Sequence, residues 1–276
     1  MGFIPNFISF SYCSKCARFC FIDDIQYEDL AFGAKLAKGV HEVTFKKGNY
    51  KGDVEAAAKC IMRYGKSPPL LKEVSIMKDL KHPNIVRFID FVPGPPSEAP
   101  GTPNPYYIVM EKGKCSLDSY LESPDNRLEE PLQNKWANEV AEAIRYLHDK
   151  DIVHRDIKPA NCLIFPELVL KVSDFGISCE GDGTKQTSNK RGTGKYRAPE
   201  VVTYGTYSKA SDVWALGILL WHIYARRKDY SSSSHLPTIG EDFPPIVKEL
   251  LPRCWETDPH NRPDIDKIVQ DDLRYL

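Results

Sequence analysis

The sequence predicts an α+β fold, because strand-like runs and helical patterns both occur along the chain. Three patterns support this prediction. Residues 46–52 read KKGNYKG, a turn composition, and a strand-like run follows them. Apolar residues recur at helical spacing over residues 70–77, after a Pro-Pro pair suited to a helix start, and again over residues 136–147. Residues 212–217 begin a segment that is apolar nearly all round, as expected for a buried helix.

Length and composition indicate an ordinary globular chain of one large domain or two small lobes. The 276 residues are 42% hydrophobic and 27% charged, and a formal net charge of -1 gives no electrostatic reason to expect nucleic acid. No apolar run reaches the roughly 18 residues that cross a bilayer. Several cysteines stand singly, which favours a reducing, cytoplasmic setting over a disulfide framework: Cys60, Cys115, Cys162, Cys179 and Cys254.

The most informative stretch lies between residues 154 and 176. Residues 154–161 read HRDIKPAN, and residues 174–176 read DFG. Phosphoryl transfer uses a carboxylate to orient the attacking hydroxyl, a cation for the transferring phosphate, and an Asn and an Asp to hold magnesium. The stretch contains all of these groups in a short span.

A hairpin is expected between the two motifs. Residues 162–165 and 168–172 read as short strands around a turn at Pro166-Glu167. A hairpin of that length would bring Asn161 and Asp174 close together at its open end.

These motifs, in this order and with the asparagine in register, resemble the signature of the protein kinase family. The resemblance covers residues 25–276. It implies a bilobal protein kinase fold, with a small β-rich N-lobe that carries one long helix (25–111) and a larger helical C-lobe (112–276). It also implies ATP and Mg²⁺ as cofactors and a protein as the substrate. Residues 1–24 precede this domain as an extension rich in cysteine and aromatic residues.

The resemblance implies the catalytic roles residue by residue. Asp156 would accept the proton of the acceptor hydroxyl, and Lys158 would neutralise charge on the γ-phosphate. Asn161 and Asp174 would hold the magnesium ion. Thr193 would contact Asp156 and Lys158 and help to seat the substrate.

Two segments indicate the kind of substrate. The K-P-A-N at residues 158–161 resembles the serine/threonine version of the loop, since tyrosine-specific members usually carry an Ala-Arg pair there. Residues 192–200 read GTGKYRAPE and match the family's G-T-x-x-Y-x-A-P-E. Together with IQYEDL at residues 25–30 and the CW, DP and RP pairs near the end, they look most like the tyrosine-kinase-like branch of serine/threonine kinases.

The nucleotide side is implied in the same way. Residues 55–61 match the third-strand A-x-K, so Lys59 would reach the α and β phosphates, held by an ion pair with Glu73. Met110 resembles the gatekeeper, and residues 111–113 resemble the hinge whose backbone would hydrogen-bond adenine. The residues implied to bind the nucleotide are Lys59, Glu73, Gly33, Val40, Ala57, Met110, Glu111, Gly113 and Leu163.

The glycine-rich loop departs from the family pattern. In the register of G-x-G-x-x-G-x-V only Gly33 and Val40 fit, with Lys35 and Lys38 at other glycine positions. A side chain there crowds the triphosphate, although a lysine could supply charge instead. In the alternative register the turn uses Gly39, and Val43 is the strand valine.

The extension before residue 25 allows three hypotheses. Cys13, Cys16 and Cys20 could ligate a metal, but no fourth ligand lies nearby. Reversible acylation of these cysteines could give peripheral membrane association. The segment could also be a plain extension that packs on the fold.

Two functions of different classes remain. The first is an active serine/threonine protein kinase acting in signalling, since every expected catalytic residue is present. The second is a catalytically weak pseudokinase that serves as a scaffold or switch, which the altered glycine-rich loop and the short connection between Trp221 and Cys254 favour. The physiological substrate, the upstream activator and the oligomeric state are not predicted.

Overall fold

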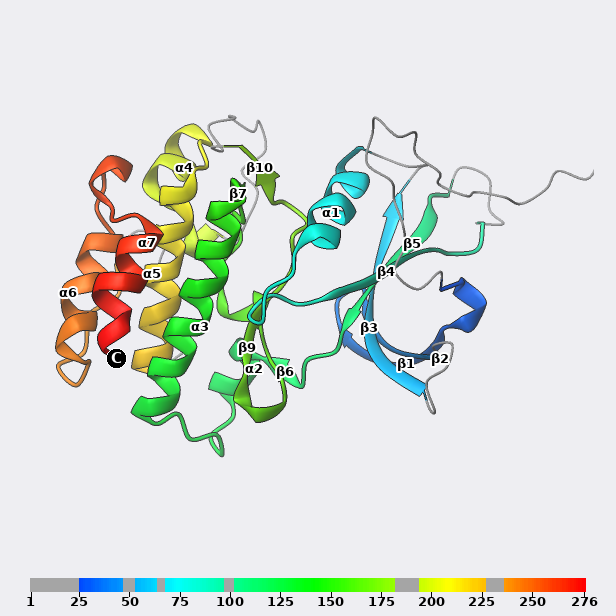
Figure 1. Ribbon diagram of the computed structural model, residues 1–276, viewed down its shortest axis with the longest axis horizontal. Coiled ribbons are helices and arrows are strands. Elements are labelled where there is room, and N and C mark those ends of the chain that lie inside the picture. The colour runs from blue at the N-terminus through cyan, green and yellow to red at the C-terminus, as the bar shows by residue number, and fades with distance from the viewer. Residues whose placement is uncertain (1–24, 47–52, 64–67, 97–101, 182–193, 227–235) are drawn as a thin grey trace, which may run out of the picture. The chain divides into compact units, whose positions relative to one another are not determined.

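The computed structural model describes residues 25–46, 53–63, 68–96, 102–181, 194–226 and 236–276 (Figure 1). The chain divides into two compact units. Unit 1 combines Met1–Ser67 with Phe88–Glu111, and unit 2 combines Pro68–Arg87 with Lys112–Leu276. Unit 1 is built on a β-sheet and unit 2 mainly on helices, which confirms the α+β prediction.

The strands are β1 Ala31–Ala37, β2 Val40–Lys46, β3 Asp53–Arg63, β4 Phe88–Pro93, β5 Asn104–Glu111, β6 Cys115–Ser116, β7 Ile152–Val153, β8 Cys162–Ile164, β9 Leu170–Val172 and β10 Cys179–Glu180. The helices are α1 Pro68–Asp79, α2 Leu117–Glu122, α3 Glu130–Asp149, α4 Pro199–Tyr204, α5 Lys209–Ala225, α6 Pro245–Cys254 and α7 Ile265–Lys267. A π-helical turn, Ile268–Asp272, and a short 3₁₀ turn, Leu273–Tyr275, continue α7 to the chain end. No helix in these described ranges is long and apolar enough to span a membrane.

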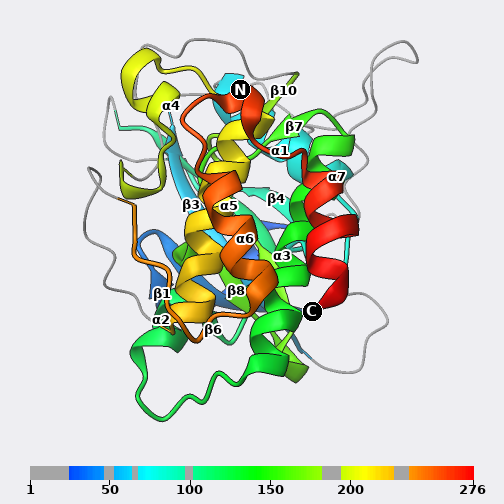
Figure 2. The same cartoon turned by 90° about the vertical axis from the view of Figure 1, so that its left-hand side faces the viewer.

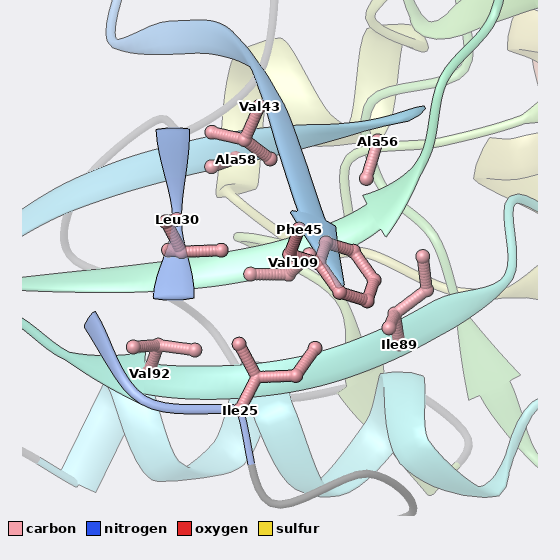
Figure 3. Close-up of a cluster of buried hydrophobic side chains, with 9 residues drawn as sticks. All are labelled: Ile25, Leu30, Val43, Phe45, Ala56, Ala58, Ile89, Val92 and Val109. Atoms are coloured by element: carbon pink, nitrogen blue, oxygen red, sulfur yellow. The ribbon is translucent and has the colours of Figure 1, made fainter. Parts of the chain in front are cut away.

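Unit 1 is an antiparallel sheet in the order β1-β2-β3-β5-β4. One face carries the core, because alternate residues of each strand point to the same side. The segment that precedes β1 closes this face, and the Asp90 carboxylate accepts the backbone N–H of Ile25 at 2.8 Å. The buried residues of this core are Ile25, Leu30, Val43, Phe45, Ala56, Ala58, Ile89, Val92 and Val109 (Figure 3).

Unit 2 is centred on α3 and α5, which pack against each other, with α6 on α5 (Figure 2). Helix α3 buries one stripe that includes Trp136, Ile144 and Leu147. Helix α5 is buried at nearly every position from Ser211 to Tyr224, as its all-round apolar sequence predicts. These two helices therefore form the support on which the neighbouring loops rest.

The segment after α1 is attached to unit 2 by its backbone. Val86 N–H donates to the carbonyl of Val172 at 2.9 Å, and Val172 N–H donates to the carbonyl of Asn84 at 2.8 Å. The phenolic oxygen of Tyr146 accepts the N–H of Lys81 at 2.9 Å. Helix α1 thus continues into a strand-like segment that is paired within unit 2.

The helix start predicted at the Pro-Pro pair and the predicted hairpin are confirmed. Helix α1 begins at Pro68, and Ser116 caps α2 by accepting the N–H of Ser119 at 3.1 Å. Strands β8 and β9 pair antiparallel around a 3₁₀ turn that begins at Pro166. Just beyond this pairing, Ser173 N–H donates to the carbonyl of Asn161 at 2.8 Å, so the hairpin returns the chain to one edge.

Candidate active site

The loop of residues 154–161 is held in place by hydrogen bonds to a side chain of α5. The Asp212 carboxylate accepts the backbone N–H of His154 through Oδ2 and of Arg155 through Oδ1, both at 2.8 Å. Arg155 has a φ of 72°, a left-handed conformation that is costly for a residue with a side chain. Two hydrogen bonds to one buried carboxylate hold the chain in this conformation.

The Asp212 carboxylate stays ionised despite its burial. Burial raises its pKa, but the hydrogen bond with His148, the electrostatic effects of His148 and His154 and the backbone N–H of Arg155 outweigh this, and the pKa of Asp212 is lowered overall. His148 Nε2 lies 3.1 Å from Asp212 Oδ2. The loop is therefore bound to a charged acceptor within unit 2.

Three predicted catalytic residues meet on this loop. Lys158 Nζ lies 2.6 Å from Asp156 Oδ2, and the Asn161 amide Nδ2 donates to the same oxygen at 2.9 Å and to the Asp156 carbonyl at 2.8 Å. With both donor bonds directed at Asp156, Asn161 Oδ1 is oriented away from it and accepts no hydrogen bond from the described residues. That amide oxygen is available as a ligand for a hard cation.

Asp174 lies two residues after the end of β9 and also has a left-handed backbone, with a φ of 65°. Its Oδ1 accepts the N–H of Gly176 at 3.3 Å. The next residue, Phe175, is buried and its ring meets the His154 ring edge-on with centroids 5.1 Å apart. The two predicted motifs therefore contact each other through His154 and Phe175.

Asn161 and Asp174 fit the Mg²⁺ that the resemblance implies. They offer an amide oxygen and a carboxylate, and Mg²⁺ in phosphoryl-transfer sites commonly takes one or two protein ligands and fills the rest with water and phosphate oxygens. In the described part of the chain, no group of three or more His, Cys, Asp or Glu side chains could hold a metal by itself. A metal held by these two residues would therefore depend on the nucleotide.

Sequence reasoning missed three residues that support the loop. His148 pairs with Asp212, Ser173 donates its hydroxyl to the Asn161 carbonyl at 2.9 Å, and Ser178 donates its hydroxyl to the His154 carbonyl at 3.1 Å. None lies in the quoted motifs. The sequence feature that comes closest to marking them is the position of Ser173 and Ser178 on either side of the DFG at residues 174–176.

In unit 1, the predicted nucleotide-binding residues of three strands share the face opposite the core. Val40 pairs with Lys59, and Lys59 pairs with Ile108 on β5. Ala57 pairs with Met110 in the next row of the same face. Directly opposed residues point to the same side of an antiparallel sheet, so Val40, Lys59, Ala57 and Met110 are brought together.

The turn between β1 and β2 uses Lys38-Gly39, and Gly39 has a φ of 71°. This agrees with the alternative register of the glycine-rich loop. Val43, however, belongs to the core and not to the face of Lys59, so it is not the valine that faces a nucleotide. Lys35 pairs with His41, which pairs with Ala58, so the strand register puts Lys35 on the face of Ala58 and not on that of Lys59. That a lysine of this loop supplies charge to the phosphates stays a prediction.

Further predicted residues belong to the hinge and the α1 region. Gly113 packs closely on β8, since an added Cβ would lie 3.1 Å from the Leu163 Cβ, so these two predicted residues are neighbours in unit 2. Glu111 ends β5 in unit 1. Glu73 is buried on α1 in unit 2, while Lys59 belongs to unit 1, and the ion pair between them stays a prediction.

The segment after residue 193 is anchored by an ion pair. Arg262 Nη1 and Nη2 each lie 2.7 Å from one oxygen of Glu200, and the Arg262 guanidinium lies 5.0 Å above the Trp214 ring. This bidentate pair joins α4 to the segment between α6 and α7. Thr193 and the extension with Cys13, Cys16 and Cys20 lie outside the described residues.

Comparisons with known proteins agree with this geometry. Residues 31–273 match the family model described as "Protein kinase domain". The chain is 34% identical over 268 residues, 90% of its length, to 30% of the "Tyrosine-protein kinase transforming protein Fps" of Fujinami sarcoma virus. It is 32% identical over 264 residues, 90% of its length, to 44% of the "Serine/threonine-protein kinase STY46" of Arabidopsis thaliana. The human "Tyrosine-protein kinase Fer" is 29% identical over 266 residues, with 90% of this chain and 31% of that protein covered. The chain thus spans less than half of the length of these curated relatives.

Proposed function

Because this chain belongs to the protein kinase family, we propose that it transfers the γ-phosphoryl group of Mg-ATP to a serine or threonine hydroxyl of a protein substrate. Members of the family generally use ATP and Mg²⁺. The observation that carries the proposal is the contact of Lys158 with Asp156 at 2.6 Å. This contact keeps a cation beside the carboxylate that would accept the proton of the acceptor hydroxyl. Both residues lie in or next to the K-P-A-N segment that is typical of serine/threonine enzymes.

Each residue of the loop would act on a defined group. Asp156 orients the acceptor hydroxyl and takes its proton late in the transfer, which contributes roughly 10²–10⁴-fold to the rate. Lys158 balances negative charge on the transferring phosphoryl group. Asn161 and Asp174 would hold Mg²⁺, which supplies charge neutralisation for the phosphate oxygens. Asp212 acts through the backbone of the loop and is a positioning residue.

The choice of acceptor follows from the side chain at position 158. The relatives named above include both tyrosine and serine/threonine kinases, so overall similarity does not decide it. Lys158 belongs to the K-P-A-N segment of residues 158–161, which resembles the serine/threonine version of the loop, whereas tyrosine-specific members usually carry an Ala-Arg pair there. This resemblance favours serine or threonine as the acceptor.

A transfer assay tests the proposal. Purified protein with Mg²⁺ and labelled ATP should phosphorylate itself or a basic test protein, and matched peptides differing only in Ser, Thr or Tyr should give transfer to Ser or Thr. Asp156→Asn should abolish transfer. Asp151→Asn is the control, since Asp151 is exposed and paired with Lys209 at 2.7 Å, away from these contacts. Transfer that survives Asp156→Asn, or transfer only to Tyr, would overturn the proposal.

A pseudokinase function is the second candidate. Its support is the β1–β2 turn, in which Gly39 has Lys38 before it and Val40 after it in place of further glycines. Side chains in this turn reduce the space in which backbone N–H groups could approach phosphates. Nucleotide binding without any transfer, under conditions in which the protein is folded, would favour this function.

A further inference from the structure

Three aromatic rings form a cluster on the core side of the sheet in unit 1. The ring centroids of Tyr27 and Tyr107 lie 5.5 Å apart, those of Tyr27 and Phe32 5.6 Å, and those of Phe32 and Tyr107 5.2 Å. Phe32 pairs with the core residue Val43, so both side chains point to the same side of the sheet. Tyr27 and Tyr107 pack against the core itself, so the cluster lies at the margin of the core that Figure 3 shows.

Two sulfur-containing side chains of β3 extend this surface. Cys60 lies directly opposite Tyr107, and its Sγ is 4.0 Å from the Sδ of Met62, two residues further along β3. Burial and the neighbouring side chains of Cys60 and Tyr27 raise the pKa of the Tyr107 hydroxyl, as expected for a phenol that is partly removed from water. We call the surface formed by Tyr27, Phe32, Cys60, Met62 and Tyr107 the aromatic face.

The aromatic face is only partly covered. Phe32 is 40% exposed and Met62 is 49% exposed. Large apolar side chains that are exposed together usually mark the site of a contact. The neighbouring part of the same side of the sheet is closed by the chain ahead of β1, where Ile25 and Leu30 are both buried. The described part of this segment therefore covers the core and leaves the aromatic face partly open to water.

The chain ahead of residue 25 joins the fold beside the aromatic face. The N–H of Ile25 is bound to the Asp90 carboxylate on β4, and Tyr27 follows two residues later. Two residues of extended chain span at most about 7 Å, so residue 25 lies close to a ring of the aromatic face. A segment tethered at this point has a local concentration on the order of millimolar at the face.

Residues 3–22 have a composition that suits this surface. They contain five of the twelve phenylalanines of the protein and no acidic residue. Their only charged side chains, Lys15 and Arg18, are basic, whereas the 3₁₀ turn before β1 presents the exposed acids Glu28 and Asp29. Both the apolar content and the charge of the segment therefore complement the aromatic face and its margin.

We propose that residues 3–22 dock on the aromatic face and complete the cover of unit 1 that Ile25 and Leu30 begin. The docked phenylalanines cover Phe32 and Met62, and the apolar surface that both partners remove from water stabilises the contact. The inference is independent of the proposed function, because the aromatic face is on the opposite side of the sheet from Lys59.

Cross-linking of the full chain tests the contact, because the segment and the aromatic face both carry cysteines. A short bis-maleimide should join Cys60 to a cysteine of residues 13–20, as identified by mass spectrometry. The yield should not fall on dilution, since the contact is within one chain. Cys115 is the internal control, because it is half-buried like Cys60 but belongs to unit 2, and its yield should be at least about tenfold lower.

The alkylation rate of Cys60 measures how well the face is covered. Phe7→Ser combined with Phe10→Ser removes two rings from the segment, so the rate should rise by about tenfold. Ser9→Ala combined with Ser11→Ala is the matched control, since it changes the same stretch without removing a ring, and it should leave the rate unchanged. All four positions lie outside the described fold, so the variants should unfold at the same temperature as the parent.

Several results would overturn the inference. Equal cross-linking yields at Cys60 and Cys115, or an unchanged alkylation rate after loss of the two rings, would show that the segment does not cover the face. A cross-linking yield that falls on dilution would assign the face to a second copy of the chain. Binding of the full chain to vesicles of anionic phospholipid with an unchanged alkylation rate of Cys60 would assign residues 3–22 to a membrane surface instead.

Discussion

The backbone N–H of Arg155 donates to Oδ1 of Asp212 at 2.8 Å while Arg155 has a φ of 72°. The two residues are 57 positions apart in the chain. A conformation that is unfavourable for arginine is thus stabilised by a helix that takes no direct part in the chemistry. The geometry of the catalytic loop depends on a side chain outside the loop.

Replacing Asp212 by Asn should destabilise the fold and slow transfer. The amide has only one acceptor oxygen for two backbone donors, and removal of a buried charged partner costs about 3 kcal/mol of unfolding free energy. Denaturant unfolding measures this loss. The value of kcat should fall while KM for ATP changes little, because the loop and not the nucleotide face is disturbed. Asp151→Asn, at an exposed ion pair, should change neither quantity appreciably.

The same residue predicts a pH dependence. The pKa of Asp212 is lowered in the folded state, so the unfolded state binds more protons at acid pH. Its stabilising contribution is complete above the unfolded pKa of about 4 and is lost as pH falls through the folded pKa. The difference in unfolding free energy between the parent and Asp212→Asn should be constant from about pH 8 to 6 and shrink below about pH 4. A difference that grows on acidification would contradict this sign.

Arg262→Lys should lower the free energy of unfolding far more than is usual for the replacement of one basic residue by another. The Arg262 side chain is fully buried and bonds both Glu200 oxygens, and its Nε donates to the Glu256 carbonyl at 2.8 Å. A lysine ammonium cannot reproduce this fork, so a loss of about 3 kcal/mol in unfolding free energy is expected. Arg253→Lys is the matched control, since Arg253 pairs with Asp272 at 2.7 Å but is 44% exposed. Equal losses of unfolding free energy in the two variants would show that burial of the ion pair does not determine its contribution to stability.

Gly113→Ala should disturb the hinge side of unit 2. An added Cβ would lie 3.1 Å from the Leu163 Cβ and 3.4 Å from the Ile164 carbonyl oxygen, which forces β6 and β8 apart. Overpacking of this kind costs about 1–3 kcal/mol, and the dissociation constant for ATP should rise. Gly194→Ala is a suitable control for stability, because nothing lies within 4 Å of its added Cβ. Thermal unfolding and nucleotide titration measure the two effects.

The thiol of Cys162 should be inert in the folded protein. Burial raises the pKa of Cys162 to about 12, so the nucleophilic thiolate is absent at pH 8. Site-resolved mass spectrometry after brief alkylation should find Cys60, which is partly exposed, labelled before Cys162. In 6 M guanidinium both should react. Labelling of Cys162 at the rate of Cys60 under native conditions would contradict the burial argument.

The parts of the site that could be predicted from sequence are those confined to short motifs. The spacing of Asp156, Lys158 and Asn161 fixes their contacts because all three lie on one loop and its 3₁₀ turn. The contact between His148 and Asp212 joins residues 64 positions apart. No local pattern encodes that contact, so it could be found only from the folded chain.

The strand register was the least predictable feature. Successive side chains of a strand alternate between faces, so an error of one residue exchanges the core face and the nucleotide face. The sequence allowed Val40 or Val43 as the valine of the predicted nucleotide site, and the strand pairing puts only Val40 on the face of Lys59.

The hydrogen bond from Ile25 N–H to Asp90 has a mechanical consequence. It fastens the chain to β4 at the point where the closing segment of the sheet begins. A load applied to the polypeptide ahead of residue 25 is therefore transmitted to the middle of β4, and β1 is shielded from it. Pulling on the chain ahead of residue 25 should therefore load β4, one edge strand of the sheet, before it peels β1, the strand at the other edge.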